Sequence, residues 1–394
     1  MTPIKRTLTL LALALVASCA SQSTLIPAGS TCTTTTFAVL DDFSGARRGA
    51  CEVRGDNSVR IEIVPEDSAV QNPSPWFAFK LVPARATSAE VVLDYQSWKH
   101  RYVPKTSTDG VHWSPLAADA VQVSANGRRA TLSIALGNET VWVAAHELIT
   151  PTVYDDWEAR MAARSNARLS VFGESRTGRK IMRLDGTSDS RDVVLLVGRQ
   201  HPPEVSGAFA FFGFWETVFG DSSLAARFRE RFQVISIPLL NPDGVANGHW
   251  RHNLGRTDLN RDWGPFVQPE TQLIKTLLDK LDREGYRLRA FIDFHSTNRN
   301  LFYTQADTDP TDPPNFSRDW LDAARPRLND YPFTNEDRPT SDTANGKNYM
   351  YKRYGIPSVT YEVGDETDRA TTRAAAAIFA EEFMKLLLQH ADKQ

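Results

Sequence analysis

Two side chains that can bind a metal stand three positions apart near the middle of this 394-residue chain. They are His201 and Glu204, and the two prolines between them stiffen the backbone. The apolar run 193–197 predicts a buried strand before the pair, and residues 205–219 are long enough for a helix after it. The pair therefore lies at a strand-to-helix corner, where an imidazole and a carboxylate can turn toward one point. A zinc ion accepts such ligands but needs a third from elsewhere in the chain.

His295 is the candidate for that third ligand. It ends another strand-like run, 288–294, and ligands at the carboxyl ends of two strands of one sheet can meet in the crevice above it. The set of His201, Glu204 and His295 leaves a fourth position for water, as a catalytic zinc site requires. Asp293 precedes His295 by two residues on the same strand face, so its carboxylate could orient the imidazole ring.

A longer segment adds much stronger evidence, because a lone pair of ligands at this spacing is common by chance. Residues 241–263 contain Asn-Pro-Asp-Gly at 241–244, Gly-His-Trp-Arg-His-Asn at 248–253 and Asp-Leu-Asn-Arg at 258–261. Together with His-Pro-Pro-Glu these motifs resemble the M14 family of zinc carboxypeptidases, and within it the branch called cytosolic carboxypeptidases. The resemblance covers about residues 37–390 and implies a β-rich domain before the catalytic domain. It also implies a single Zn²⁺ held by the two histidines and the glutamate.

The resemblance implies roles for residues of this segment. Asn260 and Arg261 match the pair that binds the terminal carboxylate of the substrate, which suits a planar guanidinium with a neighbouring amide. Arg251 matches the arginine that stabilises the oxyanion formed at the peptide carbonyl. The alternative for either arginine is a surface or structural ion pair. His249 and His252 flank Arg251, and we expect them to line the loop rather than to bind metal.

A carboxylate near the end of the chain is the candidate general base. The apolar strand that starts at residue 356 carries Glu362 near its end, after an aromatic residue, where the family has its catalytic glutamate. Such a base takes a proton from the attacking water and passes it to the leaving amine. Asp365 and Glu366 are rivals, but they follow Gly364 in an expected loop.

The specificity pocket is expected to draw on residues 343–348. Counting back from the base places Lys347 or Asn348 near the substrate side chain, and a lysine there would favour an acidic C-terminal residue. An exposed lysine on a loop is the alternative, and Arg299 is a second cationic candidate. Three tyrosines lie in the region where family members have a tyrosine that caps the substrate, and none of them is assigned that role: Tyr349, Tyr351 and Tyr354.

Residues 37–150 and 151–394 have different patterns of predicted secondary structure. Residues 37–150 contain short alternating runs separated by turn signals, which predict an all-β, sandwich-like domain. The runs are 59–63, 76–82, 90–95, 130–136 and 140–144. After a boundary near 150, strands alternate with helices, which predicts an α/β domain over 151–394 with a mixed, mostly parallel sheet. Its expected helices include 154–164, 270–281 and 374–388.

The start of the chain has features of an exported protein. Residues 1–18 have a basic beginning and an apolar run that is too short to span a bilayer, the pattern of a signal peptide. Small residues before Cys19 resemble the lipobox of bacterial lipoproteins, which implies cleavage before Cys19 and its acylation; a plain secretory signal is the alternative. Ala20 is not the Asp that retains lipoproteins at the inner membrane, so the resemblance implies the outer membrane, facing the periplasm. Residues 19–36, rich in Ser and Thr, are interpreted as a lipidated tether.

Cysteine usage and charge narrow the possibilities. Cys32 and Cys51 would meet an oxidising compartment after export and could form a disulfide, with two free thiols as the alternative. The net charge of −3 gives no reason to expect nucleic acid as a partner. The sequence gives no oligomeric state.

These features together predict an exported zinc metallocarboxypeptidase. Its expected partners are the C-termini of peptides or proteins, acidic ones in particular if Lys347 faces the pocket, and a membrane through the lipid at Cys19. A hydrolase of cell-wall peptides is an alternative. A catalytically dead, lipid-anchored binding module is another, although the intact set of ligands, arginines and Glu362 argues against it.

Overall fold

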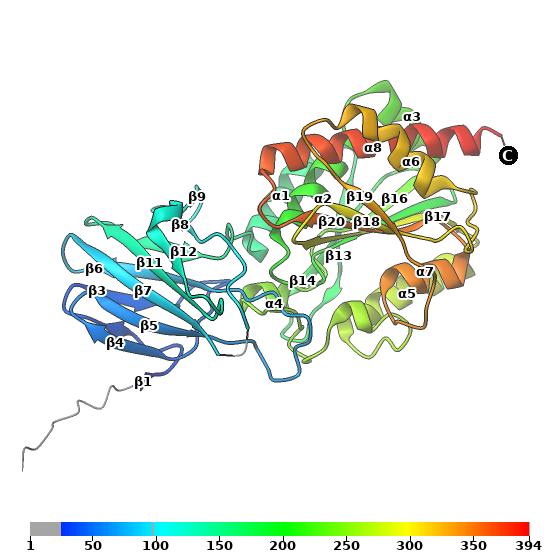
Figure 1. The fold of residues 1–394 in the computed structure, drawn as a ribbon. Helices are drawn as coiled ribbons and strands as arrows, with labels where there is room; N and C mark the ends of the chain where they lie inside the picture. The colour runs from blue at the N-terminus through cyan, green and yellow to red at the C-terminus, as the bar shows by residue number, and fades with distance from the viewer. Residues whose placement is uncertain (1–24, 97, 394) are drawn as a thin grey trace, which may run out of the picture.

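The computed structural model describes residues 25–96 and 98–393 as a β-rich first domain joined to an α/β second domain (Figure 1). Both parts agree with the fold class predicted from the sequence, and α1 begins at Pro151, directly after the expected boundary. No helix within the described residues is long and apolar enough to cross a bilayer.

The first domain consists of two six-stranded sheets, with orders β1-β4-β5-β7-β11-β10 and β2-β3-β6-β12-β8-β9. Alternate residues of its strands point inward, as Val59, Ile61 and Ile63 of β5 show, and bury a shared apolar core. Strand β5 pairs with β7 in parallel, whereas the other pairs described in this domain are antiparallel. The strands are β1 (Leu25–Ile26), β2 (Cys32–Thr33), β3 (Phe37–Leu40), β4 (Cys51–Gly55), β5 (Ser58–Ile63), β6 (Ala78–Pro83), β7 (Thr87–Tyr95), β8 (Lys105–Ser107), β9 (Ser114–Pro115), β10 (Val121–Val123), β11 (Arg129–Leu136) and β12 (Val141–Ala144).

The predicted tether over 19–36 is wrong over residues 25–36, because β1 and β2 lie there and pair with β4 and β3. A Thr side chain of this segment forms a turn instead of a solvated linker. The Thr34 hydroxyl accepts hydrogen bonds from the backbone N–H groups of Thr36 and Phe37 and so forms the turn between β2 and β3. Cys19 and the predicted signal peptide lie outside the described residues.

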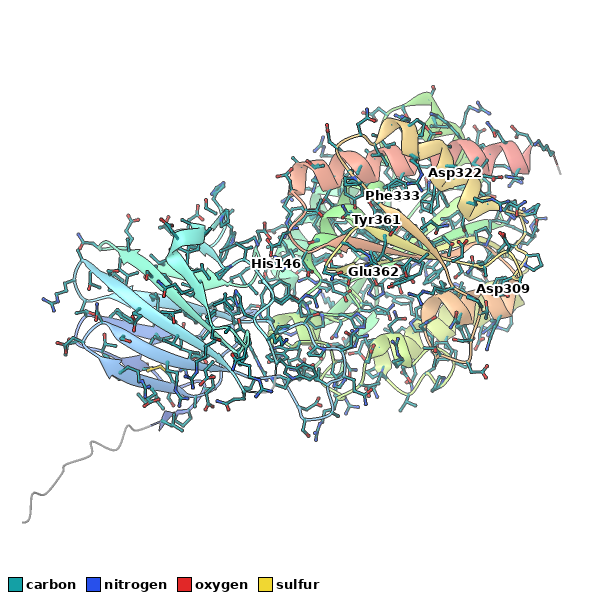
Figure 2. All side chains as sticks on the ribbon, in the orientation of Figure 1. His146, Asp309, Asp322, Phe333, Tyr361 and Glu362 are labelled. Atoms are coloured by element: carbon teal, nitrogen blue, oxygen red, sulfur yellow. A yellow bond between two sulfur atoms is a disulfide. The ribbon has the colours of Figure 1, made fainter. Side chains whose placement is uncertain are left out.

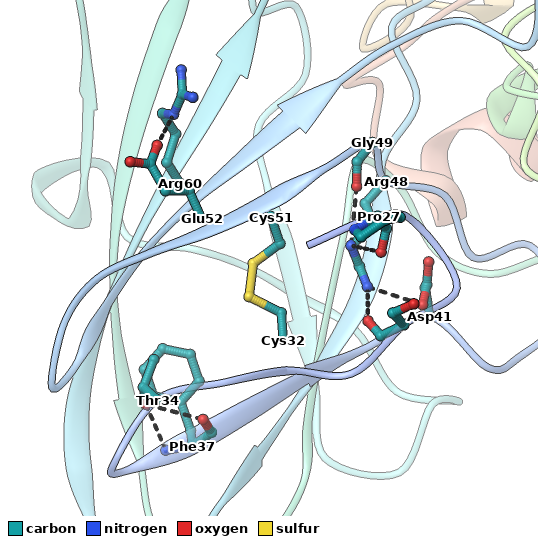
Figure 3. Close-up of a disulfide and its surroundings, with 11 residues drawn as sticks. Pro27, Cys32, Thr34, Phe37, Asp41, Arg48, Gly49, Cys51, Glu52 and Arg60 are labelled. Carbon is teal, nitrogen blue, oxygen red and sulfur yellow. Dashed lines mark hydrogen bonds and ion pairs between the residues drawn. A yellow bond between two sulfur atoms is a disulfide. The ribbon is translucent and has the colours of Figure 1, made fainter. Parts of the chain in front are cut away.

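The predicted disulfide between Cys32 and Cys51 is confirmed (Figure 3). Both residues are fully buried, and the bond joins β2 of one sheet to β4 of the other. Nearby, Arg48 donates to the carbonyl oxygen of Ser30 and lies 3.5 Å from Asp41, which ties the same edge of the sandwich together. The disulfide therefore links the two sheets near the start of the described chain.

The second domain is built on an eight-stranded sheet of order β13-β14-β16-β15-β17-β20-β18-β19. The four central strands, β16, β15, β17 and β20, run parallel, and antiparallel pairs flank them. The strands are β13 (Arg168–Glu174), β14 (Lys180–Asp185), β15 (Asp192–Gly198), β16 (Gln233–Ile237), β17 (Arg287–Thr297), β18 (Leu301–Thr304), β19 (Thr334–Asp337) and β20 (Ser358–Gly364).

Helices cover both faces of this sheet, which explains why its central strands read as continuous apolar runs (Figure 1). On β15, Val194 and Leu196 pack against the side of α1, α2, α3, α6 and α8, whereas Val193, Leu195 and Val197 pack against the side of α5 and α7. The helices are α1 (Pro151–Arg164), α2 (Val205–Val218), α3 (Ser223–Arg231), α4 (Pro242–Ala246), α5 (Pro269–Arg283), α6 (Phe316–Ala324), α7 (Gly346–Tyr354) and α8 (Arg369–Ala391).

Candidate active site

The candidate residues gather at the carboxyl ends of three adjacent strands, β15, β17 and β20. Strand β15 lies between β16 and β17, so the chain leaves β15 toward one side and later returns on the other. Such a switch in direction opens a crevice above the strand ends. The register places Gly198 beside Phe294, and His295 directly opposite Glu362. The sheet itself therefore brings β17 and β20 residues to the corner that follows β15.

The three predicted ligands meet in this crevice. Nδ1 of His201 lies 2.8 Å from Oε1 of Glu204, and Nδ1 of His295 lies 2.7 Å from Oε2 of the same carboxylate. One donor atom from each residue lies within 4.8 Å of the other two, and all three side chains are buried. Burial acts to raise the pKa of Glu204, but the two imidazoles outweigh it and hold the pKa below its ordinary range. Two imidazole nitrogens and an ionised carboxylate are a donor set that fits a catalytic zinc ion.

A second pair of carboxylates lies behind the two imidazoles. Oδ2 of Asp293 is 2.8 Å from Nε2 of His295, the contact expected from the strand parity. Oδ1 of Asp258 is 2.9 Å from Nε2 of His201, and this contact was not predicted. A carboxylate that accepts the Nε2 proton leaves the Nδ1 lone pair free for a metal and fixes the ring plane. Each imidazole is therefore oriented with Nδ1 toward the common point.

Close packing holds the corner that carries His201 and Glu204. A Cβ atom on Gly207 of α2 would lie 2.5 Å from the carbonyl oxygen of His295, so a glycine is required where the helix crosses β17. Gln200 donates to Asp293 at 2.6 Å and accepts from the indole of Trp263 at 2.9 Å. The corner is thus tied to both the helix and the neighbouring strand.

Glu362 faces the same crevice from β20, next to Tyr361 (Figure 2). Its Oε2 atom is buried and has no hydrogen-bond partner among the described residues. Burial raises the pKa of the Glu362 carboxyl to about 7, with the imidazoles of His295 and His201 opposing the shift and Glu204 adding to it. A carboxyl in this range can both accept and return a proton near neutral pH.

The two rival carboxylates point to the first domain instead. Asp365 pairs with Arg101 at 2.8 Å, and Glu366 pairs with Lys105 at 3.0 Å. Both pairs join the turn after β20 to residues 101–105, where β8 begins. Neither carboxylate lines the cavity, so their geometry favours Glu362 as the base.

The motif residues Arg251, Asn260 and Arg261 also line the cavity, which has a volume of about 590 Å³. Nε of Arg251 donates to Oδ2 of Asp258 at 2.6 Å. Oδ1 of Asn260 accepts from the backbone of Gly346 at 2.9 Å, and its Nδ2 lies 3.2 Å from Nε2 of His295. Arg261 is exposed, and its Nη1 donates to the carbonyl oxygen of Asn260 at 2.6 Å. These groups surround the crevice with hydrogen-bond donors.

Lys347 lies in the cavity wall, so the alternative of an exposed lysine on a loop is wrong. It stands in the first turn of α7 and is buried. Its Nζ donates to the carbonyl oxygens of Thr304 and Arg338, each at 3.1 Å. Burial lowers the pKa of its ammonium group to about 8, with Asp309 opposing the shift. Arg299, the second cationic candidate, pairs with Glu336 on the surface and does not line the cavity.

The tyrosine in the cavity wall is one that the sequence did not point to. Tyr303 of β18 lines the cavity, and burial together with the charge of Glu362 raises the pKa of its hydroxyl. Its strand is only four residues long and carries no motif. The three tyrosines of α7 contact structural neighbours: Tyr349 packs on Phe266, Tyr351 donates to Pro310, and Tyr354 donates to Asp282.

The histidines that flank Arg251 do not face the cavity. Nδ1 of His249 donates to the carbonyl oxygen of His252 at 2.9 Å. Nδ1 of His252 lies 2.9 Å from Oδ2 of Asp67, a residue of the first domain. Asn348 also lines the cavity, but its side-chain amide donates to Ser341 and Thr343.

A family of proteins described as zinc carboxypeptidases has a sequence profile that matches residues 154–383, more than half of the chain. The chain belongs to this family, M14. Its members are zinc-dependent carboxypeptidases, and both the resemblance inferred from the motifs and the prediction of an enzyme are confirmed.

Individual relatives agree with this membership. A cytosolic carboxypeptidase of Mus musculus is 34% identical over 121 residues, which are 29% of this chain and 12% of the mouse protein. A protein of Zymomonas mobilis is 24% identical over 62% of this chain and 63% of its own length. The chain thus spans less than two thirds of the length of these relatives.

Solved structures share the fold across both domains. A metallo-carboxypeptidase of Burkholderia cenocepacia has a TM-score of 0.75 at 18% identity and covers 91% of this chain and 99% of its own. A metallo-carboxypeptidase of Pseudomonas aeruginosa, in complex with (2-guanidinoethylmercapto)succinic acid, has a TM-score of 0.73 at 20% identity, covering 89% and 99%. The pairing of a β-rich first domain with an α/β second domain therefore recurs among bacterial proteins.

Proposed function

We propose that this carboxypeptidase hydrolyses C-terminal residues from peptides or proteins with one Zn²⁺ held by His201, Glu204 and His295. The convergence of their donor atoms within 4.8 Å, beside a buried and unpartnered oxygen of Glu362, is the observation that supports the proposal. A zinc ion held there supplies Lewis acidity toward a carbonyl oxygen and a site for water.

The residues around the crevice have separate roles in peptide hydrolysis. Arg261 and Asn260 hold the terminal carboxylate, which places the last peptide bond beside Glu362. Glu362 takes the proton of the attacking water and delivers it to the leaving amine, as a carboxyl with a pKa near neutrality can. The Arg251 guanidinium, steadied by Asp258, donates to the oxyanion as the carbonyl carbon becomes tetrahedral.

We further propose that the enzyme prefers an acidic C-terminal side chain. Lys347 supports this preference, because carbonyl oxygens take two of its three ammonium protons and its side chain forms part of the cavity wall. The cations Arg101, Arg338 and Lys347 line the cavity beside the two motif arginines. A buried carboxylate on the substrate would be stabilised by this positive field, whereas a basic one would be repelled.

We propose an exported location for the enzyme. The disulfide between Cys32 and Cys51 supports it, since such bonds persist in oxidising compartments. In this proposal Cys19 carries the lipid that anchors the protein to the outer membrane on its periplasmic side.

The central test of the mechanism is Glu362→Gln, with Glu366→Gln as the control. We expect Glu362→Gln to keep one zinc per chain, measured by atomic emission, and to lose nearly all hydrolysis of a C-terminal peptide bond. Glu366→Gln should keep most of it, because Glu366 pairs with Lys105 outside the cavity. Retained turnover in Glu362→Gln would rule out the assigned base.

The proposed preference is tested separately with a peptide library that varies only in its C-terminal residue. Cleavage is followed by mass spectrometry with and without a chelator. We expect peptides ending in Glu or Asp to be shortened fastest. Faster removal of Lys or Arg would overturn the acidic preference while leaving the carboxypeptidase mechanism intact.

A further inference from the structure

The loop that carries Arg251 is held by the first domain rather than by its own. The indole of Trp250 is fully buried in the apolar core of the first domain. Its Nε1 donates to the carbonyl oxygen of Trp76 at 2.9 Å. Trp250 therefore anchors the loop between α4 and the motif Asp258–Arg261 to a different domain.

A single carboxylate of the first domain binds the backbone of this loop. Glu66 lies in the connection between β5 and β6, which extends toward the second domain (Figure 1). Its Oε2 accepts the N–H of Trp250 at 2.7 Å, and its Oε1 accepts the N–H groups of Arg251 and His252 at 3.0 and 2.6 Å. Three successive backbone N–H groups that converge on one carboxylate fix the backbone conformation of those residues.

This contact determines where the Arg251 guanidinium can reach. Its backbone N–H is bound by Glu66, its Nε by Asp258, and its Nη1 lies 3.4 Å from the carbonyl oxygen of Asn72. Glu66 and Asn72 belong to the first domain, whereas Asp258 belongs to the second. The position of the guanidinium is therefore set jointly by the two domains.

Contacts that only hold the two domains together would not need to bind the backbone of Arg251. The first and second domains are also joined by ion pairs away from the loop, such as Arg369 with Glu147 at 3.0 Å and Lys105 with Glu366. Glu66 differs from these pairs because it binds the backbone of a cavity-lining residue directly.

We propose that Glu66 is a positioning residue for the reaction and that the β-rich domain thereby completes the active site. Glu66 acts through Arg251 and does not contact the substrate. The inference rests on the proposed function, specifically on the role of Arg251 at the oxyanion.

The test is a double-mutant cycle of Glu66→Gln and Arg251→Ala in the full-length, zinc-loaded enzyme. A glutamine side chain has nearly the shape of glutamate, but its amide presents a donor to a backbone N–H and loses the charge. We expect Glu66→Gln to lower kcat about tenfold with little change in KM and in zinc content. In the Arg251→Ala background the same change should lower kcat less than about twofold, since the residue through which Glu66 acts is gone.

The control is Glu90→Gln, an exposed carboxylate of the same domain that accepts from Ser58, and it should leave kcat unchanged. A tenfold loss from Glu66→Gln in both backgrounds would overturn the proposal, because Glu66 would then act independently of Arg251. An unchanged kcat in Glu66→Gln would overturn it as well.

Failure of the underlying function gives a different result. If Arg251→Ala alone keeps full kcat, the oxyanion role and the positioning role both fall. If Arg251→Ala loses activity and Glu66→Gln does not, only the positioning role falls. Should Glu66→Gln not fold, Glu66→Asp replaces it in the cycle, because it keeps the charge but shortens the side chain that reaches the three N–H groups. Additive losses there would overturn the proposal.

Discussion

Asp258 links His201, a proposed metal ligand, to Arg251, the arginine proposed to stabilise the oxyanion. Its two carboxylate oxygens divide between Nε2 of His201 at 2.9 Å and Nε of Arg251 at 2.6 Å, while Oδ1 also accepts the N–H of Asn260. Asp258→Asn preserves the shape of the side chain but replaces one acceptor by a donor. Both partners then lose the charged carboxylate, and either Arg251 or His201 faces an N–H donor in place of its acceptor.

The size of the effect follows from that lost contact. A hydrogen bond to a charged group contributes about 1.5–3 kcal/mol, and 1.36 kcal/mol corresponds to tenfold in rate. We therefore expect kcat/KM of Asp258→Asn to fall about 10- to 150-fold in excess zinc. At limiting zinc the loss should be larger, because removing the carboxylate behind a metal-binding imidazole weakens metal affinity by about 10- to 100-fold.

The assay is steady-state hydrolysis of an N-blocked peptide, with zinc content measured on the same samples. Asp282→Asn is the matched control, since Asp282 is exposed on α5 and pairs with Arg353. An Asp258→Asn enzyme with normal kcat/KM and normal zinc affinity would refute the reasoning that Asp258 orients both partners.

Three further changes test other parts of the structure. Lys347→Met should reduce the preference for C-terminal Glu over Gln about tenfold or more. In the unmodified protein this preference should fall as pH rises through about 8, because the ammonium group of Lys347 loses its proton there. Glu158→Gln should stabilise the protein increasingly from pH 5 to pH 8 in thermal unfolding. Burial, followed by the charge of Asp155, raises the pKa of Glu158 in the folded protein from 4.5 to about 8. Between these two pH values the carboxyl ionises only in the unfolded chain, so the free energy of unfolding falls as pH rises, by about 3 kcal/mol at pH 7 relative to low pH. Replacing Cys32 and Cys51 together by Ser should lower the stability of the first domain by about 3 kcal/mol, read from denaturant unfolding; an unchanged midpoint would contradict the stabilising role of the disulfide.

Local patterns in the sequence were sufficient for most of the fold. Alternation identified β5, since Val59, Ile61 and Ile63 point to one face, and the continuous apolar run of β15 indicated burial on both faces. Strand parity also predicted the contact of Asp293 with His295, because β17 continues to Thr297 without a break at either residue.

Local sequence patterns could not predict contacts between segments far apart in the chain. Asp258 reaches His201 across 57 residues from a short 3₁₀ turn, where the strand rule of alternate faces does not apply. Glu66 binds the Arg251 backbone across 185 residues and across a domain boundary. The sequence alone does not decide whether Lys347 lies on an exposed loop or in the pocket wall, because its burial depends on the packing of α7 against the sheet.

Residues 25–36 differ from the predicted tether for a related reason. Ser and Thr are typical of solvated linkers, yet the Thr34 hydroxyl bonds to the backbone of the next turn and Cys32 is fixed by its disulfide. Composition alone does not distinguish a linker from a short strand whose polar side chains cap a turn.

The central claim is that this enzyme is a zinc carboxypeptidase that recognises a free terminal carboxylate. Two peptides of one sequence, ending in Glu as the free acid or as the amide, test it most directly when incubated with the zinc-loaded protein and followed by mass spectrometry. We expect loss of the terminal residue from the free acid alone, abolished by a chelator and restored by zinc. Equal shortening of the amide, or shortening that a chelator does not affect, would contradict the claim.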